Sequence, residues 1–394
     1  MLPIWITGAL VLVAFLIVVS DAVRGRGAGT RRPVDRGLER WAQAVQFRLP
    51  RAFDALQLAP AGHLKAGRRP GIVMHGPGTA TTAGWQWTIE LPGSTVDDDV
   101  DPERLAGAIN QGAVMVDVIE VRRRAAGWAD VTAYRTDPLK LDNRIPFQPG
   151  ALPVHAWGDR WSLGRARDGR EVRLPLWLPG GGAHHAMYSG ATGSGKTRWM
   201  LVGIAHAMQL GAEIYLVDLV KGVDDRDWQP IHRGLVDAWD KPADAVKSLT
   251  ALLDDTLARP RWEPRDPGRF RLVVIDEMQA LVASKPGAAI LTRLVAEGRS
   301  KGLAVFGATQ LPLTTQISSI ARTNFRVKMA GRLDNEAEYR AALGGKWPGS
   351  RIADDAQHWG VGYVDLDGRG AQRFRGWHVS DGWLREHTRR CGKA

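Results

Sequence analysis

The sequence contains a single cysteine, Cys391, and shows no internal repeat. An internal disulfide bond is therefore excluded, and nothing indicates an oxidising compartment. The chain also lacks the low hydrophobicity of a disordered protein, since 44% of its 394 residues are hydrophobic and 24% are charged. This length accommodates a membrane anchor and two folded domains, one of them large.

Charged residues are absent from residues 2–19, and nearly all residues of this run are apolar. A helix of this length reaches about 27 Å, enough to cross a hydrocarbon core. A secretory signal peptide is the main alternative, but its basic residues precede the apolar run, whereas here four arginines between Arg24 and Arg32 follow it. We therefore predict a single-pass transmembrane anchor over residues 1–23 in the inner (plasma) membrane, with the rest of the chain cytoplasmic.

Positive charge is concentrated next to this run. The net charge is +11, and residues 20–70 hold eleven Lys or Arg against four acidic residues. Such charge suits a polyanionic partner, and it suits a membrane surface equally well. We predict that residues 24–79 form a basic juxtamembrane linker with an amphipathic helix over residues 38–58, which Pro50 breaks or bends.

Two different patterns of secondary structure follow the linker. Residues 80–150 contain strand-like alternation, as at residues 85–91, and a helix start at Asp101, which together predict a small α+β domain. From about His155 onward, buried strands alternate with helices, which is typical of a mostly parallel sheet. We predict an α/β motor domain over 151–380 and a basic tail over 381–394.

A glycine-rich segment lies between a predicted strand and a predicted helix and matches the Walker A pattern, or P-loop. Its backbone N–H groups can turn inward around phosphate, and the following helix N-terminus adds its dipole. Lys196 is expected to reach the β and γ phosphates, and the Thr197 hydroxyl is expected to ligate Mg²⁺. The predicted nucleotide-binding residues are Gly190, Ala191, Thr192, Gly193, Ser194, Gly195, Lys196 and Thr197.

Two acidic residues end the buried strand predicted at residues 272–276. Asp276 lies at the carboxyl end of that strand, where open α/β sheets bind ligands, and we expect it to hold the Mg²⁺ through water. Glu277 is the predicted general base that polarises the attacking water. The alternative for Glu277 is an acidic residue that stabilises a helix start through the dipole.

Further polar residues are candidates for the same site. Gln310 ends the strand predicted at residues 303–309 and can contact the γ-phosphate or the water, although it can also be a plain polar strand terminus. An arginine acting in trans on a neighbour's nucleotide can raise the rate by about 10³ to 10⁵. Arg299, Arg322 and Arg332 are candidates for that role, although for any single one of them a surface salt bridge is the favoured interpretation.

Two other groups of residues are interpreted as structural. His184 and His185 are adjacent on a predicted strand, so their side chains point to opposite faces and do not easily share a metal ion. Trp85 and Trp87 share one face of a strand, which favours core packing over base stacking.

The chain resembles the FtsK/SpoIIIE family of DNA translocases over roughly residues 155–370. It is most similar to the shorter members used in actinobacterial conjugative plasmid transfer, which also place a small α/β domain before the motor. The resemblance rests on the order of the P-loop, Leu-Val-Asp-Leu-Val-Lys-Gly (216–222), Val-Ile-Asp-Glu (274–277), Glu-Gly-Arg-Ser-Lys-Gly (297–302), Ala-Thr-Gln (308–310) and Thr-Asn-Phe (323–325).

This resemblance implies a fold and a function. It implies a RecA-like P-loop NTPase motor, ATP and Mg²⁺ as cofactors, a homo-hexameric ring, and double-stranded DNA as the partner that ATP hydrolysis moves through the ring. Together with the residues above, the expected architecture is an α/β motor domain with a small preceding α+β domain and an N-terminal transmembrane helix. One segment departs from the family pattern: residues 218–222 lack the proline of the usual Asp-Pro-Lys-Gly and are one residue longer, so Asp218 matches better than Lys221.

Three alternatives remain at this point. An ATPase of a protein secretion system, similar to type VII systems, and a type IV coupling protein belong to the same superfamily, whereas a non-hydrolysing membrane scaffold is a different class. The intact Lys196, Thr197, Asp276 and Glu277 argue against the scaffold. Secretion relatives tend to carry several ATPase domains in tandem, and the single P-loop here therefore favours DNA as the substrate.

Overall fold

The computed structural model describes residues 36–56, 72–81, 84–90, 102–110, 114–125, 127–140, 156–264, 270–310, 317–345 and 349–391. Within these ranges no helix is both long enough and apolar enough to cross a membrane. The predicted anchor falls at residues 1–23, outside the described residues.

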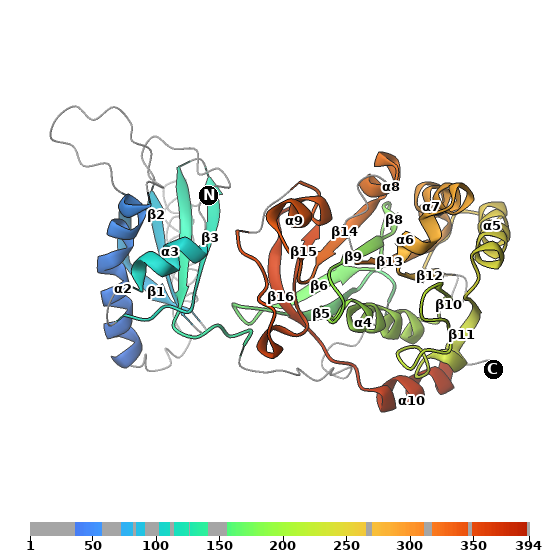
Figure 1. Ribbon diagram of the computed structural model, residues 1–394, viewed down its shortest axis with the longest axis horizontal. Coiled ribbons are helices and arrows are strands. Elements are labelled where there is room, and N and C mark those ends of the chain that lie inside the picture. The colour runs from blue at the N-terminus through green and yellow to red at the C-terminus, as the bar shows by residue number, and fades with distance from the viewer. Residues whose placement is uncertain are drawn as a thin grey trace, which may run out of the picture.

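A small domain occupies one end of the molecule, where an antiparallel sheet packs against two helices (Figure 1). Its sheet has the order β1-β2-β4-β3. Alternate residues of β2 are buried, which places Trp85 and Trp87 in the same core as Val45 and Leu49 of helix α2. The elements are α2 (Arg36–Ala55), β1 (Val73–Ala80), β2 (Trp85–Glu90), α3 (Pro102–Ile109), β3 (Val118–Ala125) and β4 (Trp128–Tyr134).

The larger domain is built on a mixed sheet in which ten of the described strands pair in the order β11-β10-β12-β13-β9-β14-β15-β16-β5-β6. The strands from β11 to β14 are parallel, and those from β14 to β6 pair antiparallel. The strands are β5 (Arg160–Ala166), β6 (Glu171–Pro175), β9 (His185–Ser189), β10 (Glu213–Asp218), β11 (Leu235–Trp239), β12 (Arg271–Asp276), β13 (Leu303–Thr309), β14 (Phe325–Ala330), β15 (Val361–Leu366) and β16 (Gln372–Gly376), and a separate pair is formed by β7 (Trp177–Leu178) and β8 (Gly182–Ala183).

Helices cover both faces of the parallel half, because its strands are apolar on both faces (Figure 1). On β12, Leu272 and Val274 pack in the cluster that contains α4, whereas Val273 and Ile275 pack in the cluster that contains α5 and α7. The helices are α4 (Lys196–Gln209), α5 (Pro242–Ala258), α6 (Met278–Val282), α7 (Lys285–Glu297), α8 (Ser319–Asn324), α9 (Glu336–Ala342) and α10 (Asp381–Cys391), with 3-10 turns η2 (His232–Gly234), η3 (Arg299–Lys301) and η4 (Ala356–His358).

Several expectations from the sequence need adjustment. Helix α2 continues through Pro50 instead of ending there, because Leu49 and Phe53 on either side of it are fully buried in the small-domain core. Strand β1 lies within residues assigned to the linker. The sheet is only half parallel, since antiparallel strands extend it beyond β14. Residues expected to be a tail include helix α10, whose Leu384 is buried beside α4.

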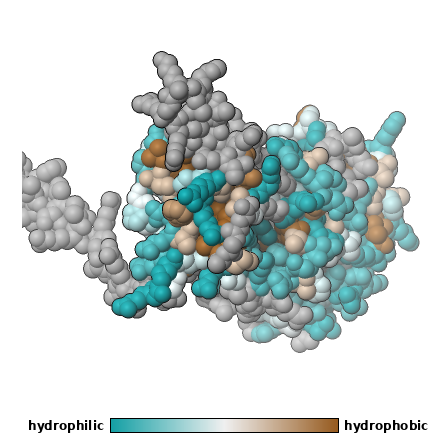
Figure 2. Space-filling view, turned by 60° about the vertical axis from the view of Figure 1, so that its left-hand side comes forward, coloured by the Kyte–Doolittle hydropathy of each residue, from teal (hydrophilic) through white to brown (hydrophobic). Residues whose placement is uncertain are grey.

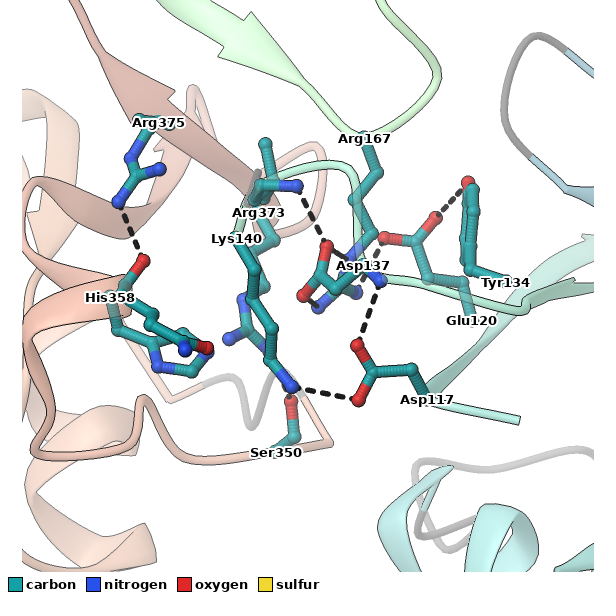
Figure 3. A network of polar contacts seen from close by, with 12 residues as sticks. Asp117, Glu120, Tyr134, Asp137, Lys140, Arg167, Ser350, His358, Arg373 and Arg375 are labelled. Carbon is teal, nitrogen blue, oxygen red and sulfur yellow. Dashed lines mark hydrogen bonds and ion pairs between the residues drawn. The ribbon is translucent and has the colours of Figure 1, made fainter. Parts of the chain in front are cut away.

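A network of polar contacts, with a buried ion pair at its centre, joins the two domains (Figure 3). The Arg167 guanidinium follows β5 of the large domain and is 3% exposed. It donates two hydrogen bonds to Asp137, at 2.9 and 2.8 Å, and one to Glu120 at 2.9 Å, both in the small domain. Burial by itself would raise the pKa of Asp137. The hydrogen bond and charge of Arg167 outweigh burial and hold that pKa below its ordinary value. The two domains are therefore joined through a desolvated ion pair.

The surface of the described residues is mostly hydrophilic, with hydrophobic residues set between hydrophilic ones on the face shown in Figure 2. Large hydrophobic side chains that stand exposed among the described residues include Phe47, Met115 and Trp359. Single exposed hydrophobic residues are common on protein surfaces, so exposure alone does not indicate a binding role for any of these three side chains.

Candidate nucleotide-binding and hydrolysis site

The P-loop joins the carboxyl end of β9 to the first turn of α4, at the edge where the neighbouring parallel strands also end. Backbone hydrogen bonds fix its start: Gly190 N–H donates to the Thr309 carbonyl at 3.1 Å, and Ala191 N–H donates to the Arg332 carbonyl at 2.8 Å. Gly195 has φ of 101°, in the left-handed region that favours glycine. The loop therefore lies between the ends of β13 and β14, the usual ligand position in such sheets.

Lys196 is buried within this loop, with 6% of its surface exposed. Its Nζ donates to the Gly190 carbonyl at 2.6 Å and to the Ala191 carbonyl at 3.2 Å. Burial lowers the pKa of Lys196, and the carboxylates of Glu277 and Asp276 oppose that shift. The ammonium thus lies between the phosphate cradle and the two acidic residues predicted from the sequence, while Thr197 follows it half-buried on α4.

Asp276 ends β12 with only 1% of its surface exposed. Its Oδ1 accepts the Glu277 N–H at 3.2 Å, whereas its Oδ2 has no hydrogen-bond partner among the described residues and lies 3.5 Å from Lys221 Nζ. Burial raises the pKa of Asp276 to about 6, and Lys221 opposes this shift while Asp218 and Glu277 add to it. A buried carboxylate oxygen that lacks a hydrogen bond is the ligand type that suits a hydrated Mg²⁺.

Asp218 lies directly opposite Asp276 on the neighbouring strand β10. Its Oδ2 accepts the Trp228 indole N–H at 2.8 Å, and its Oδ1 accepts the N–H groups of Val220 and Lys221. These bonds direct the segment after β10 so that the Lys221 side chain reaches Asp276. The family resemblance included Asp218 and Lys221 without assigning them to the nucleotide site, and it missed Trp228, which carries no local signal.

Glu277 is the residue before α6 and has a left-handed backbone, with φ of 52°. Such a conformation costs a non-glycine residue about 1–3 kcal/mol and marks functional sites. Its side chain is held by two amides: Gln310 Nε2 donates to Oε1 at 2.7 Å, and Gln279 Nε2 donates to Oε2. The structure therefore brings together Glu277 and Gln310, which the sequence proposed separately, and adds Gln279, which it missed.

The three arginine candidates lie in different surroundings. Arg299 donates to the carbonyls of Ala183 at 3.1 Å and Gly181 at 2.7 Å, near the edge where β13 begins. Arg332 pairs with Asp354 and donates to the carbonyl of Thr192 in its own P-loop at 3.3 Å. Arg322 on α8 has a buried Nε without a hydrogen-bond partner among the described residues. The trans role stays a prediction for all three.

The histidines and tryptophans set aside in the sequence lie in the protein core. His184 and His185 are both buried, and burial lowers the pKa of His184 to about 4 and that of His185 to about 3. His185 Nδ1 accepts the Val305 N–H at 2.9 Å. Across the described part of the chain, no cluster of three or more His, Cys, Asp or Glu could hold a metal by protein ligands alone.

The residues present fit MgATP. The P-loop and Lys196 would hold the phosphates, and Thr197 with the Oδ2 of Asp276 would hold the ion and its waters. When bound, Mg²⁺ neutralises charge that develops on the phosphates. Glu277 is the carboxylate at this edge that can accept a proton from water, because Asp276 would be committed to the ion.

No protein-family model matches the chain, and no curated protein sequence matches it. Among solved structures, the pCW3 conjugation coupling protein TcpA, determined as a monomer with ATPγS, superimposes with a TM-score of 0.57 at 16% identity, covering 89% of this chain and 99% of that one. The cytoplasmic domain of the Thermomonospora curvata type VII secretion ATPase EccC superimposes with a TM-score of 0.48 at 19% sequence identity. This match covers 65% of the present chain and 34% of the EccC chain. The chain therefore shares the fold of the TcpA structure.

Proposed function

We propose that the chain hydrolyses ATP at this site. The observation that supports this most strongly is the arrangement of Glu277 beside Lys196 and Asp276. A protein that only binds nucleotide needs the P-loop and the ion ligand, but it does not need a buried carboxylate held by one amide from the end of the next strand and one from the following helix. A non-hydrolysing scaffold leaves the strained backbone of Glu277 without a purpose.

We further propose that hydrolysis drives the movement of double-stranded DNA through a homo-hexameric ring, in conjugative transfer between cells. Two observations support this proposal. The chain matches a conjugation coupling protein over 89% of its own length, and its motifs resemble those of the FtsK/SpoIIIE translocases. A motor that grips phosphate moves DNA without reading its sequence.

The test is ATP turnover by the full-length chain with and without duplex DNA. Long linear duplex is expected to raise turnover, and short duplexes that cannot thread a ring are the matched control and are expected to raise it less. DNA retention is a weaker readout, because the basic residues 20–70 can bind DNA without pumping. Turnover that rose with a secreted protein and not with DNA would replace this proposal with a secretion ATPase.

We also propose that the chain is anchored in the plasma membrane by residues 1–23, with the motor in the cytoplasm. The support is the charge-free run at residues 2–19 and the arginines that follow it. Reporter domains fused after Leu56, where helix α2 has ended, are expected to be active only in the cytoplasm. Activity confined to the outer face would contradict this topology.

A further inference from the structure

Trp359 stands exposed on a loop whose backbone is firmly held. It is 63% exposed, although tryptophan is well buried on average. The residue before it, His358, is buried at 7% exposure, with its Nδ1 2.7 Å from Asp355 Oδ1. An aromatic ring left in solvent between a buried residue and a strand start is a rigid surface that a planar ligand can use.

A buried arginine fixes this loop. Arg375 on β16 is 1% exposed, and its guanidinium donates to the carbonyls of Gln357 at 2.6 Å and of Trp359 at 3.1 Å. Figure 3 shows Arg375 reaching from its strand toward the backbone at His358. In addition, Gly376 N–H donates to the Gly360 carbonyl at 2.9 Å. The backbone of Trp359 is thus held by the sheet and not by the loop alone.

The same loop lies against the P-loop. A methyl group added at Gly195 would come within 3.2 Å of Gly360 Cα, so the two backbones are in contact. Trp199, three residues beyond Lys196 on α4, packs under β16, where a methyl group at Gly376 would meet its ring at 2.5 Å. Trp359 directly precedes Gly360 in the chain, and consecutive Cα atoms are about 3.8 Å apart. The backbone of Trp359 therefore lies one residue away from the backbone that contacts the P-loop.

We propose that Trp359 is the platform on which the purine base of the bound nucleotide stacks. This inference rests on the proposed nucleotide site. Phosphates would bind in the loop around Gly195 and Lys196. The Gly360 backbone contacts that loop, and the exposed Trp359 ring next to it is therefore within reach of a base attached to those phosphates. A tryptophan face stacks on a purine without needing a hydrogen-bond partner, and it loses little entropy because its backbone is already fixed.

The experiment measures equilibrium binding of two probes to the full-length chain by calorimetry, both in the presence of Mg²⁺. ADP carries the base, whereas inorganic tripolyphosphate carries only phosphates. Trp359→Ala is expected to weaken ADP binding roughly five- to a hundredfold, the range of base–aromatic stacking, and to leave tripolyphosphate binding unchanged. Unchanged tripolyphosphate binding also shows that the P-loop of the variant is folded.

Two control variants sharpen the test. Trp359→Phe keeps an aromatic face and is expected to retain most of the ADP affinity. Phe47→Ala removes an aromatic ring of the small domain that is similarly exposed, at 65%. This variant is expected to leave the affinity for both probes unchanged. Equal ADP affinity in Trp359→Ala and in the wild type would overturn the platform. A wild type that bound neither probe would remove the proposed nucleotide site together with this inference.

Discussion

Gln310 donates a hydrogen bond from its Nε2 to Glu277 Oε1 at 2.7 Å, across the ends of two neighbouring parallel strands. The second carboxylate oxygen accepts from Gln279 on the following helix. An amide that donates to a carboxylate fixes its direction and stabilises its charged form. The candidate general base is therefore positioned by one residue at the end of the neighbouring strand and one from the helix that follows it.

We predict that Gln310→Ala lowers ATP turnover by about tenfold or more, the scale of a lost positioning contact, while ATP binding is retained. Binding is retained because Lys196 and the P-loop are untouched. The measurement is kcat and nucleotide affinity on the same preparation. Gln279→Ala is the matched comparison, since it removes the other amide. A loss of affinity with unchanged kcat in Gln310→Ala would show that Gln310 acts on binding and not on Glu277.

A pH dependence follows from Asp276, whose pKa is raised to about 6 by burial. Its carboxylate is charged above that pH, so binding of Mg²⁺ is favoured there and is lost as pH falls through about 6. Because Mg²⁺ competes with the proton, the acid limb of the turnover profile is expected to move to lower pH as Mg²⁺ is raised. An acid limb that stayed at the same pH from limiting to saturating Mg²⁺ would contradict this assignment.

The ion pair between the domains gives a prediction about stability. Arg167→Met leaves Asp137 buried with 0% side-chain exposure and without its partner. The free energy of unfolding is expected to fall by about 3–5 kcal/mol, which is typical when one partner of a buried ion pair is removed. Denaturant unfolding measures it, and Arg173→Met, which removes a surface pair with Glu171, is the control with an expected change below about 1 kcal/mol.

The double variant Arg167→Met with Asp137→Asn is expected to recover part of this loss, because it removes the unpaired charge as well. A double variant as unstable as the sum of the two single variants would mean that the pair contributes no interaction of its own.

The parts of the site that could be predicted from the sequence are those encoded by neighbouring residues. The P-loop needs glycines at fixed spacing, and the strand before Asp276 is a run of buried apolar residues, so both are local patterns. The strand expected at residues 303–309 is present as β13 with those bounds. Gln310 was proposed for this edge because parallel strands end together.

The parts that the sequence did not predict depend on contacts between distant segments. The contact of Gly360 with Gly195 and the clamp of Arg375 on Trp359 require β15 and β16 to extend the sheet antiparallel, and nothing local indicates where a strand pairs. Likewise, Arg167 and Asp137 are 30 residues apart and belong to different domains. Helix α2 passes through Pro50 because tertiary packing overrides a local preference.

The measurement that tests the central claim most directly is ATP turnover by Glu277→Gln beside the wild type, with nucleotide binding measured on both. The variant keeps the shape of the side chain and the whole P-loop, so it is expected to bind ATP with wild-type affinity. Its turnover is expected to fall by about 10²-fold or more, because an amide cannot accept the proton of the attacking water. Lys196→Ala, which removes the buried ammonium, is expected to lose binding as well. Turnover by Glu277→Gln near the wild-type rate would contradict the account of this site.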